Sequence, residues 1–189
     1  MKTVFFDIDT QIDFLFPAGA LYVPGAEKLL PVISRLNRQA EVVVSTMCAH
    51  EENDEEFLRW PPHCVLGTAG QLKPQSTLLP ERSVVSNRPC AISLARQIIL
   101  EKQQLNLFTN PNLPALLEAL QADEYVVYGV VTEYCVGFAA LGLLDSGKPV
   151  TLLTDAIQSL REEDAARTIH DFTAKGGRLA TSSKLLPSL

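Results

Sequence analysis

Three residues whose side chains suit acyl-transfer chemistry each come shortly after a short apolar run that is typical of a buried strand. They are a carboxylate, an ammonium and a thiol: Asp9 after residues 3–8, Lys102 after 97–100 and Cys135 after 125–130. The carboxyl ends of parallel strands meet at one edge of a sheet, so we expect the three side chains to lie together there. Such a set can activate a thiol for attack on a carbonyl carbon.

Cys135 stands between a predicted strand and the helix pattern that begins at Val136. The free N–H groups at a helix start favour a thiolate, which predicts a lowered pKa for Cys135. The same groups can stabilise an oxyanion. The alternative is a buried core cysteine without reactivity.

The first predicted strand ends in a cluster of carboxylates that includes Asp7, Asp9 and Asp13. Strand alternation places Asp7 and Asp9 on the same face unless the backbone turns between them. Loop capping would also explain these residues, and Asp-x-Asp alone is equally compatible with a magnesium phosphohydrolase. The residues by themselves leave the choice between the two aspartates open.

A long segment, residues 47–82, interrupts the alternation of strands and helices and is a further candidate site. It contains Cys48-Ala49-His50, then several carboxylates up to Glu56, then His63-Cys64. Histidine and carboxylate ligands suit zinc, iron or manganese. The alternative is an acidic, solvated loop that binds nothing. His170, on a late helix pattern, is interpreted as structural or exposed.

The elements that must position these residues alternate between strand and helix along the chain. Strands are predicted at 3–8, 41–46, 97–100, 125–130 and 150–154, with a short last strand at 179–180. Helices are predicted before the second strand, from Val136 to Gly147, and from the capping-box pattern at Ser159 to Gly176. This order predicts one domain, residues 1–189, with a three-layer α/β/α sandwich around an open, mostly parallel sheet.

Composition excludes several other classes of protein. The net charge of −6 and the pI near 5.1 argue against nucleic-acid binding. No apolar stretch approaches the roughly 18 residues of a membrane span, and the N-terminus lacks the apolar core of a signal peptide. We therefore expect a cytoplasmic protein whose four cysteines stay reduced.

Taken together, the motifs resemble the isochorismatase-like cysteine hydrolases, and within them the nicotinamidases, over nearly the whole chain. Residues 9–14, Asp-Thr-Gln-Ile-Asp-Phe, are similar to the opening motif of the family, whose first aspartate is catalytic. Residues 129–136 are similar to its nucleophile segment, and Lys102 stands where the family has its lysine. The resemblance implies the isochorismatase-like hydrolase fold, selects Asp9 over Asp7, and assigns Asp9, Lys102 and Cys135 as the catalytic triad.

The resemblance also implies roles for residues around the triad. A cis peptide between Val130 and Val131 would turn the N–H groups of Val131 and Cys135 toward the substrate carbonyl as an oxyanion hole. Residues 60–70 resemble a nicotinamidase signature, which implies that Trp60 and Phe14 line the pocket for the substrate ring.

A divalent metal, zinc, manganese or iron, is implied at a four-residue site. The family pattern has Asp-x-His followed by a second histidine, and this chain has Cys48-Ala49-His50 and Glu56 instead. The candidate ligands are Cys48, His50, Glu56 and His63. No organic cofactor is expected.

The function expected from these resemblances is hydrolysis of a small amide, nicotinamide above all, to the acid and ammonia through a thioester on Cys135. Three alternatives stay open: a metal-free amidase for ureido or carbamoyl compounds, an isochorismatase-type hydrolase, and a catalytically idle binding module. The expected partners are the small amide substrate and further copies of the chain, since family members often form dimers or tetramers.

Overall fold

The seven strands found within residues 1–186 join one parallel sheet in the order β3-β4-β2-β1-β5-β6-β7. The structure is a computed structural model that describes residues 1–186. The strands are β1 (Thr3–Ile8), β2 (Val42–Cys48), β3 (Arg82–Val85), β4 (Gln97–Lys102), β5 (Glu124–Val130), β6 (Val150–Gln158) and β7 (Arg178–Ala180). Helices cover both faces, so the predicted three-layer α/β/α sandwich is confirmed.

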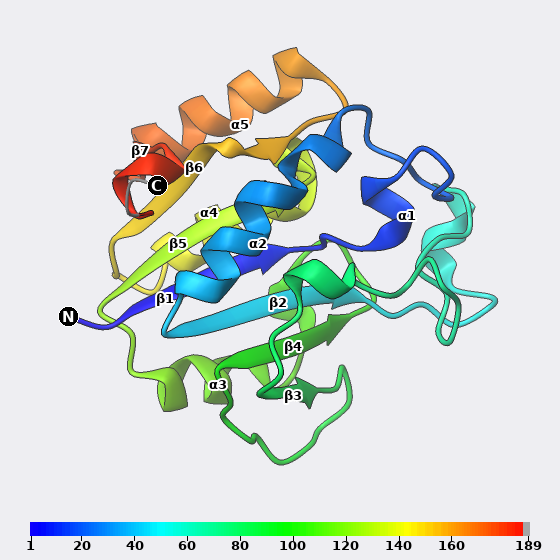
Figure 1. The fold of residues 1–189 in the computed structure, drawn as a ribbon, viewed down its shortest axis with the longest axis horizontal. Helices are drawn as coiled ribbons and strands as arrows, with labels where there is room; N and C mark the ends of the chain where they lie inside the picture. The colour runs from blue at the N-terminus through cyan, green and yellow to red at the C-terminus, as the bar shows by residue number, and fades with distance from the viewer. Residues whose placement is uncertain (187–189) are drawn as a thin grey trace.

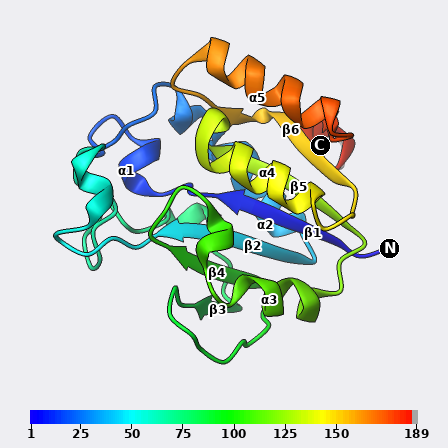
Figure 2. The same cartoon turned by 180° about the vertical axis from the view of Figure 1, so that it is seen from behind.

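In the described part of the chain, five α-helices and several short turns connect the strands. The helices are α1 (Ile12–Leu15), α2 (Leu30–Gln39), α3 (Leu113–Leu120), α4 (Gly137–Leu144) and α5 (Glu162–Ala174). Helix α2 lies across the sheet in Figure 1, whereas α3 and α4 lie on the opposite face, seen in Figure 2. Among residues 1–186, no helix is long and apolar enough to cross a membrane.

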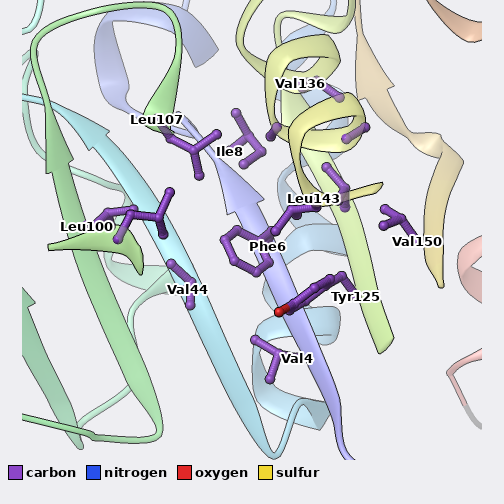
Figure 3. Packing of buried hydrophobic residues seen from close by; sticks show 14 of the residues in the cluster. Val4, Phe6, Ile8, Val44, Leu100, Leu107, Tyr125, Val136, Leu143 and Val150 are labelled. Carbon is purple, nitrogen blue, oxygen red and sulfur yellow. The ribbon is translucent and has the colours of Figure 1, made fainter. Parts of the chain in front are cut away.

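Two apolar cores hold the layers together, one on each face of the sheet. On the α4 side, alternate residues of β1, namely Val4, Phe6 and Ile8, pack with Val136 and Leu143, and Figure 3 shows this packing. On the other side, the stripe Ile33 and Leu36 of α2 packs on the sheet. Strands buried on both faces need the continuous apolar runs that the sequence shows.

The structure corrects several predicted boundaries. Strand β2 continues to Cys48 and β4 to Lys102, so both residues end their strands rather than follow them. Strand β6 continues to Gln158, and β3 was missed because its residues are mostly exposed at the edge of the sheet. Helix α5 begins at Glu162 without a side-chain cap, so the predicted capping box at Ser159 is wrong.

Candidate active site

Four adjacent strands bring the candidate residues to one edge of the sheet. Strand β1 is followed directly by Asp9, β2 ends at Cys48, β4 ends at Lys102, and Cys135 lies just beyond β5. These strands are neighbours in the order β4-β2-β1-β5, and Cys48 pairs with Lys102 in register. The segment 47–82 and α1 pass over this same edge, at the right of Figure 1.

Lys102 lies at the centre of this group, with its side chain 1% exposed. Its ammonium forms an ion pair of 2.9 Å with Asp9 Oδ2 and contacts Cys135 Sγ at 3.6 Å. It also donates hydrogen bonds to Cys48 Sγ at 3.1 Å and to the carbonyl oxygen of Gln104 at 3.0 Å. One buried cation therefore contacts the carboxylate and both thiols.

A backbone turn at Asp9 aims its carboxylate at this cation. Asp9 has φ of +48°, in the left-handed region that residues other than glycine rarely adopt. Two bonds to Thr46 fix the turn: the hydroxyl accepts from the Asp9 N–H at 3.0 Å and donates to Asp9 Oδ1 at 2.6 Å. Sequence reasoning gave Thr46 no role, because a strand threonine carries no signal of its partner.

The same turn separates the two aspartates that the sequence left open. Asp7 is fully buried on the α2 side, where its carboxylate accepts hydrogen bonds from Thr10 at 2.6 Å, Ser45 at 2.9 Å and Asn37 at 3.1 Å. Its ion-pair partner is the buried Lys73, at 3.4 Å. Asp7 thus belongs to a structural polar network and Asp9 to the group around Lys102.

Burial of the Cys135 thiol overturns the lowered pKa that was predicted for it. Burial is the largest effect and, despite the nearby charge of Lys102, raises the pKa of the Cys135 thiol well above its ordinary value. Burial would also raise the pKa of Asp9, but Lys102 and Thr46 outweigh it and lower that pKa. The resting group is therefore a thiol, a carboxylate and an ammonium.

The segment that carries Cys135, Thr132–Val136 between β5 and α4, is a short helical turn that is kinked at Tyr134, whose φ of −121° and ψ of −105° are not helical. The peptide between Val130 and Val131 is cis, as the resemblance implied. Glu133 ties the turn to the start of α5, because its carboxylate accepts from the N–H groups of Leu160 at 2.9 Å and Arg161 at 2.7 Å. These two bonds, rather than the predicted capping box, hold the backbone just before α5.

The other polar residues of the motif 9–14 hold neighbouring segments in place. The Gln11 side chain accepts from the Cys48 N–H at 2.7 Å and donates to the Cys48 carbonyl oxygen at 2.9 Å. The Asp13 carboxylate accepts from the Cys64 N–H at 2.7 Å. Gly70 packs so closely that an added Cβ would lie 2.2 Å from that carboxylate. The motif therefore positions both parts of the candidate metal site.

Three of the four candidate metal ligands form a compact buried cluster. One potential ligand atom from each of Cys48, His50 and His63 lies within 4.8 Å of the others. His50 Nδ1 bonds to Asp54 at 2.9 Å and His63 Nδ1 bonds to the Pro61 carbonyl oxygen at 2.8 Å. These bonds leave both Nε2 atoms for the cluster, and His50 Nε2 is a buried atom without a hydrogen-bond partner in the structure.

The fourth candidate, Glu56, borders this cluster, with Oε1 3.9 Å from His63 Nε2. A thiol, two imidazole nitrogens and a carboxylate are a donor set that zinc accepts, and the outer bonds to Asp54 and Pro61 are of the kind that orient histidine ligands. The residues therefore fit a divalent metal. Asp54 was not singled out from the sequence, where it is one of several loop carboxylates.

An aromatic cavity borders both the candidate metal cluster and Cys135. Its lining includes Phe14, Trp60, Tyr134 and Leu105, together with Asp9, Cys135 and Val131. The Phe14 ring lies 5.3 Å from the His63 ring, and the Trp60 ring lies 5.3 Å from the Tyr134 ring, edge to face. Trp60 and Leu105 also line an open groove of about 1080 Å³ outside the cavity. Tyr134 and Leu105 were not predicted, because loop side chains show no periodic pattern.

Comparison with known proteins identifies the class to which this fold and site belong. The model of the Isochorismatase domain family matches residues 3–184, so the chain belongs to the isochorismatase family.

Individual relatives are named for amide hydrolysis. The chain is 26% identical to the nicotinamidase of Escherichia coli K12, over 92% of each chain. Among solved structures, the pyrazinamidase of Pyrococcus horikoshii in complex with zinc matches with a TM-score of 0.82 and 28% identity, covering 96% of this chain and 99% of that one. PnC1 from L. infantum in complex with nicotinate matches with a TM-score of 0.80 and 27% identity, covering 96% and 93%. The predicted enzyme class, a hydrolase of non-peptide C–N bonds, is confirmed.

Proposed function

We propose that this protein is a cysteine-dependent nicotinamidase that converts nicotinamide to nicotinate and ammonia. One observation carries the proposal: a single buried ammonium contacts Asp9 and Cys135 beside an aromatic cavity that also borders the candidate metal cluster. A flat heteroaromatic amide has a reactive carbonyl for Cys135 and a ring nitrogen for a metal, which suits a cavity that borders both groups. The names of the E. coli and L. infantum relatives support the same substrate.

The proposed reaction starts from the neutral thiol. Asp9 takes the Cys135 proton as the sulfur attacks the carboxamide carbon, because the buried thiol is too weak an acid to ionise by itself. Lys102 stabilises the negative charge that moves from carboxylate to sulfur, since it contacts both groups. The N–H groups of Val131 and Cys135 serve as the oxyanion hole.

Collapse of the tetrahedral intermediate breaks the C–N bond and leaves a thioester on Cys135. Asp9 returns its proton to the leaving nitrogen, which departs as ammonia. Asp9 then takes a proton from a water molecule whose oxygen attacks the thioester carbon. The C–S bond breaks, the carboxylic acid is released, and Asp9 returns that proton to the sulfur of Cys135. The same carboxylate therefore acts twice as base and twice as acid within one turnover.

The ring is held by Phe14 and Trp60, and its nitrogen faces the cluster of Cys48, His50, Glu56 and His63. A divalent metal bound there supplies a Lewis-acid contact for the ring nitrogen, as the zinc complex of the P. horikoshii relative suggests. The residues of this chain hold that site rigid, because Asp54 and Pro61 fix the two imidazole rings. A cytoplasmic location and a homo-oligomeric state stay predictions.

Ammonia release from a panel of nicotinamide, pyrazinamide, ureido and carbamoyl compounds tests the proposal. We expect nicotinamide and pyrazinamide to be hydrolysed, and Cys135→Ala to abolish release while circular dichroism shows an intact fold. The exposed Cys90 provides the matched control, and Cys90→Ala should keep full activity. Turnover of nicotinamide by Cys135→Ala would exclude the mechanism, and turnover of only the ureido or carbamoyl compounds would exclude the substrate.

A further inference from the structure

The thiol of Cys48 occupies an unusual position, because it belongs to the candidate metal cluster and also contacts the ammonium of Lys102. It ends β2, is 3% exposed, and belongs to the cluster with His50 and His63. The same sulfur accepts a hydrogen bond of 3.1 Å from Lys102 Nζ. A cysteine that only filled the core would need neither set of neighbours.

The backbone of Cys48 is held firmly enough to serve as a ligand. Gln11 bonds to both its N–H and its carbonyl oxygen, at 2.7 and 2.9 Å. Ligand atoms on one tetrahedral zinc lie about 3.3 to 3.6 Å apart, from bond lengths of roughly 2.0 to 2.3 Å. The cluster atoms lie within 4.8 Å of one another, so side-chain shifts of about 1 Å would complete the site.

We propose that Cys48 binds the metal as a thiolate, which makes this a zinc-type site with a sulfur ligand, and that Lys102 hydrogen-bonds to that ligand. Soft thiolates favour zinc and cobalt over manganese and magnesium, which prefer oxygen ligands. Lys102 then performs two tasks, because it contacts the nucleophile at 3.6 Å and the metal's sulfur ligand at 3.1 Å. The inference rests on the metal site proposed above, but not on the identity of the substrate.

Cobalt(II) substitution tests the sulfur ligand directly. Protein stripped with a chelator and titrated with cobalt(II) should show a sulfur-to-cobalt charge-transfer band in the near ultraviolet and the intense visible bands of tetrahedral cobalt. Cys48→Asp should still bind cobalt but lose the charge-transfer band. Cys135→Ser, which removes the other thiol near Lys102, and Cys90→Ser should keep it. A band absent from the wild type, retained in Cys48→Asp or lost in Cys135→Ser would overturn the proposal.

The role of Lys102 and the metal preference have separate measurements. Lys102→Met should move the charge-transfer band to lower energy, because a sulfur without its hydrogen bond gives up charge more easily; an unmoved band would refute the contact. In competition between zinc and manganese, Cys48→Asp should lower the preference for zinc at least about tenfold relative to wild type, or roughly 1.4 kcal/mol. An unchanged ratio would count against the soft ligand.

X-ray absorption at the cobalt edge of the wild-type protein needs no variant. It therefore still tests the sulfur ligand if Cys48→Asp fails to fold. One sulfur scatterer at about 2.3 Å is expected, and none would overturn the proposal. The outcome is independent of the substrate proposed above. If the protein hydrolyses nicotinamide but shows no sulfur ligand, only this inference is refuted. If it shows a sulfur ligand but does not hydrolyse nicotinamide, only the proposed substrate is refuted.

Discussion

Replacing Lys73 by methionine should destabilise the fold by leaving a buried carboxylate without its cation. Lys73 is 5% exposed and Asp7 fully buried, and the two are joined at 3.4 Å. Removing one partner of a buried ion pair costs about 3–5 kcal/mol, because the charge that remains is buried and uncompensated. Three hydrogen bonds to Asp7, from Thr10, Asn37 and Ser45, persist in the variant. We therefore expect a loss near the lower end, about 3 kcal/mol.

Urea unfolding of metal-stripped protein, followed by circular dichroism, measures this loss. For a chain of this size, 3 kcal/mol corresponds to a melting temperature lower by about 6–12 °C. The exposed Lys148 is the matched control, and Lys148→Met should stay within about 0.5 kcal/mol of wild type. A loss from Lys73→Met as small as that of the control would refute the reasoning.

A double-mutant cycle separates the charge effect from lost packing. Asp7→Asn combined with Lys73→Met removes both charges, so the double variant should be more stable than the sum of the two single losses predicts. The expected coupling is about 2 kcal/mol. Strictly additive losses would show that Lys73 stabilises the fold by packing its side chain and not by compensating Asp7.

Three further predictions concern Asp9 and the segment around the nucleophile. Asp9→Asn should speed iodoacetamide labelling of Cys135, because the Asp9 charge raises the pKa of that thiol. Turnover should nevertheless drop at least about 10²-fold, because the base is lost. Slower labelling of the variant would contradict this reading. The lowered pKa of Asp9 means that its ion pair stabilises the fold above the unfolded value of 3.8 and that this stability is lost as pH falls through the lower folded value. Acid titration should therefore destabilise wild type more steeply than Asp9→Asn, and equal slopes would refute the ion pair. Gly129→Ala should lower the free energy of unfolding in urea several times as much as Gly147→Ala. Both glycines have positive φ, but only at Gly129 would an added Cβ meet a carbonyl oxygen, at 2.2 Å. Equal losses would argue against that clash.

Local patterns were sufficient for the fold class and for the positions of the three reactive residues. Apolar runs with turn residues at their ends predict buried parallel strands. A reactive residue that follows such a run is then predicted to lie at the edge of the sheet where the strands end. Asp9, Lys102 and Cys135 do lie at that edge, and Lys102 contacts both of the others. The edge strand β3 was missed because strand patterns weaken where side chains are exposed.

Contacts between distant segments could not be read from these patterns. Thr46 and Gln11 are ordinary polar residues in the sequence, and their roles exist only because β1 and β2 are neighbours. The carboxylates of Asp7 and Asp9 lie in different networks because the backbone turns at Asp9 with a positive φ, which strand alternation does not predict. Tyr134 and Leu105 reach the cavity from segments without periodicity.

The sequence by itself determined that a thiol, a carboxylate and an ammonium gather at one sheet edge, since element type and residue order are local properties. Only the tertiary structure decided the protonation of that group, because pKa values depend on burial and on distances between charges. The helix position of Cys135 predicted a lowered pKa, and burial reversed it. The structure also showed that Cys48 lies against Lys102 as well as in the candidate metal cluster, and its contact with Lys102 depends on the register between β2 and β4.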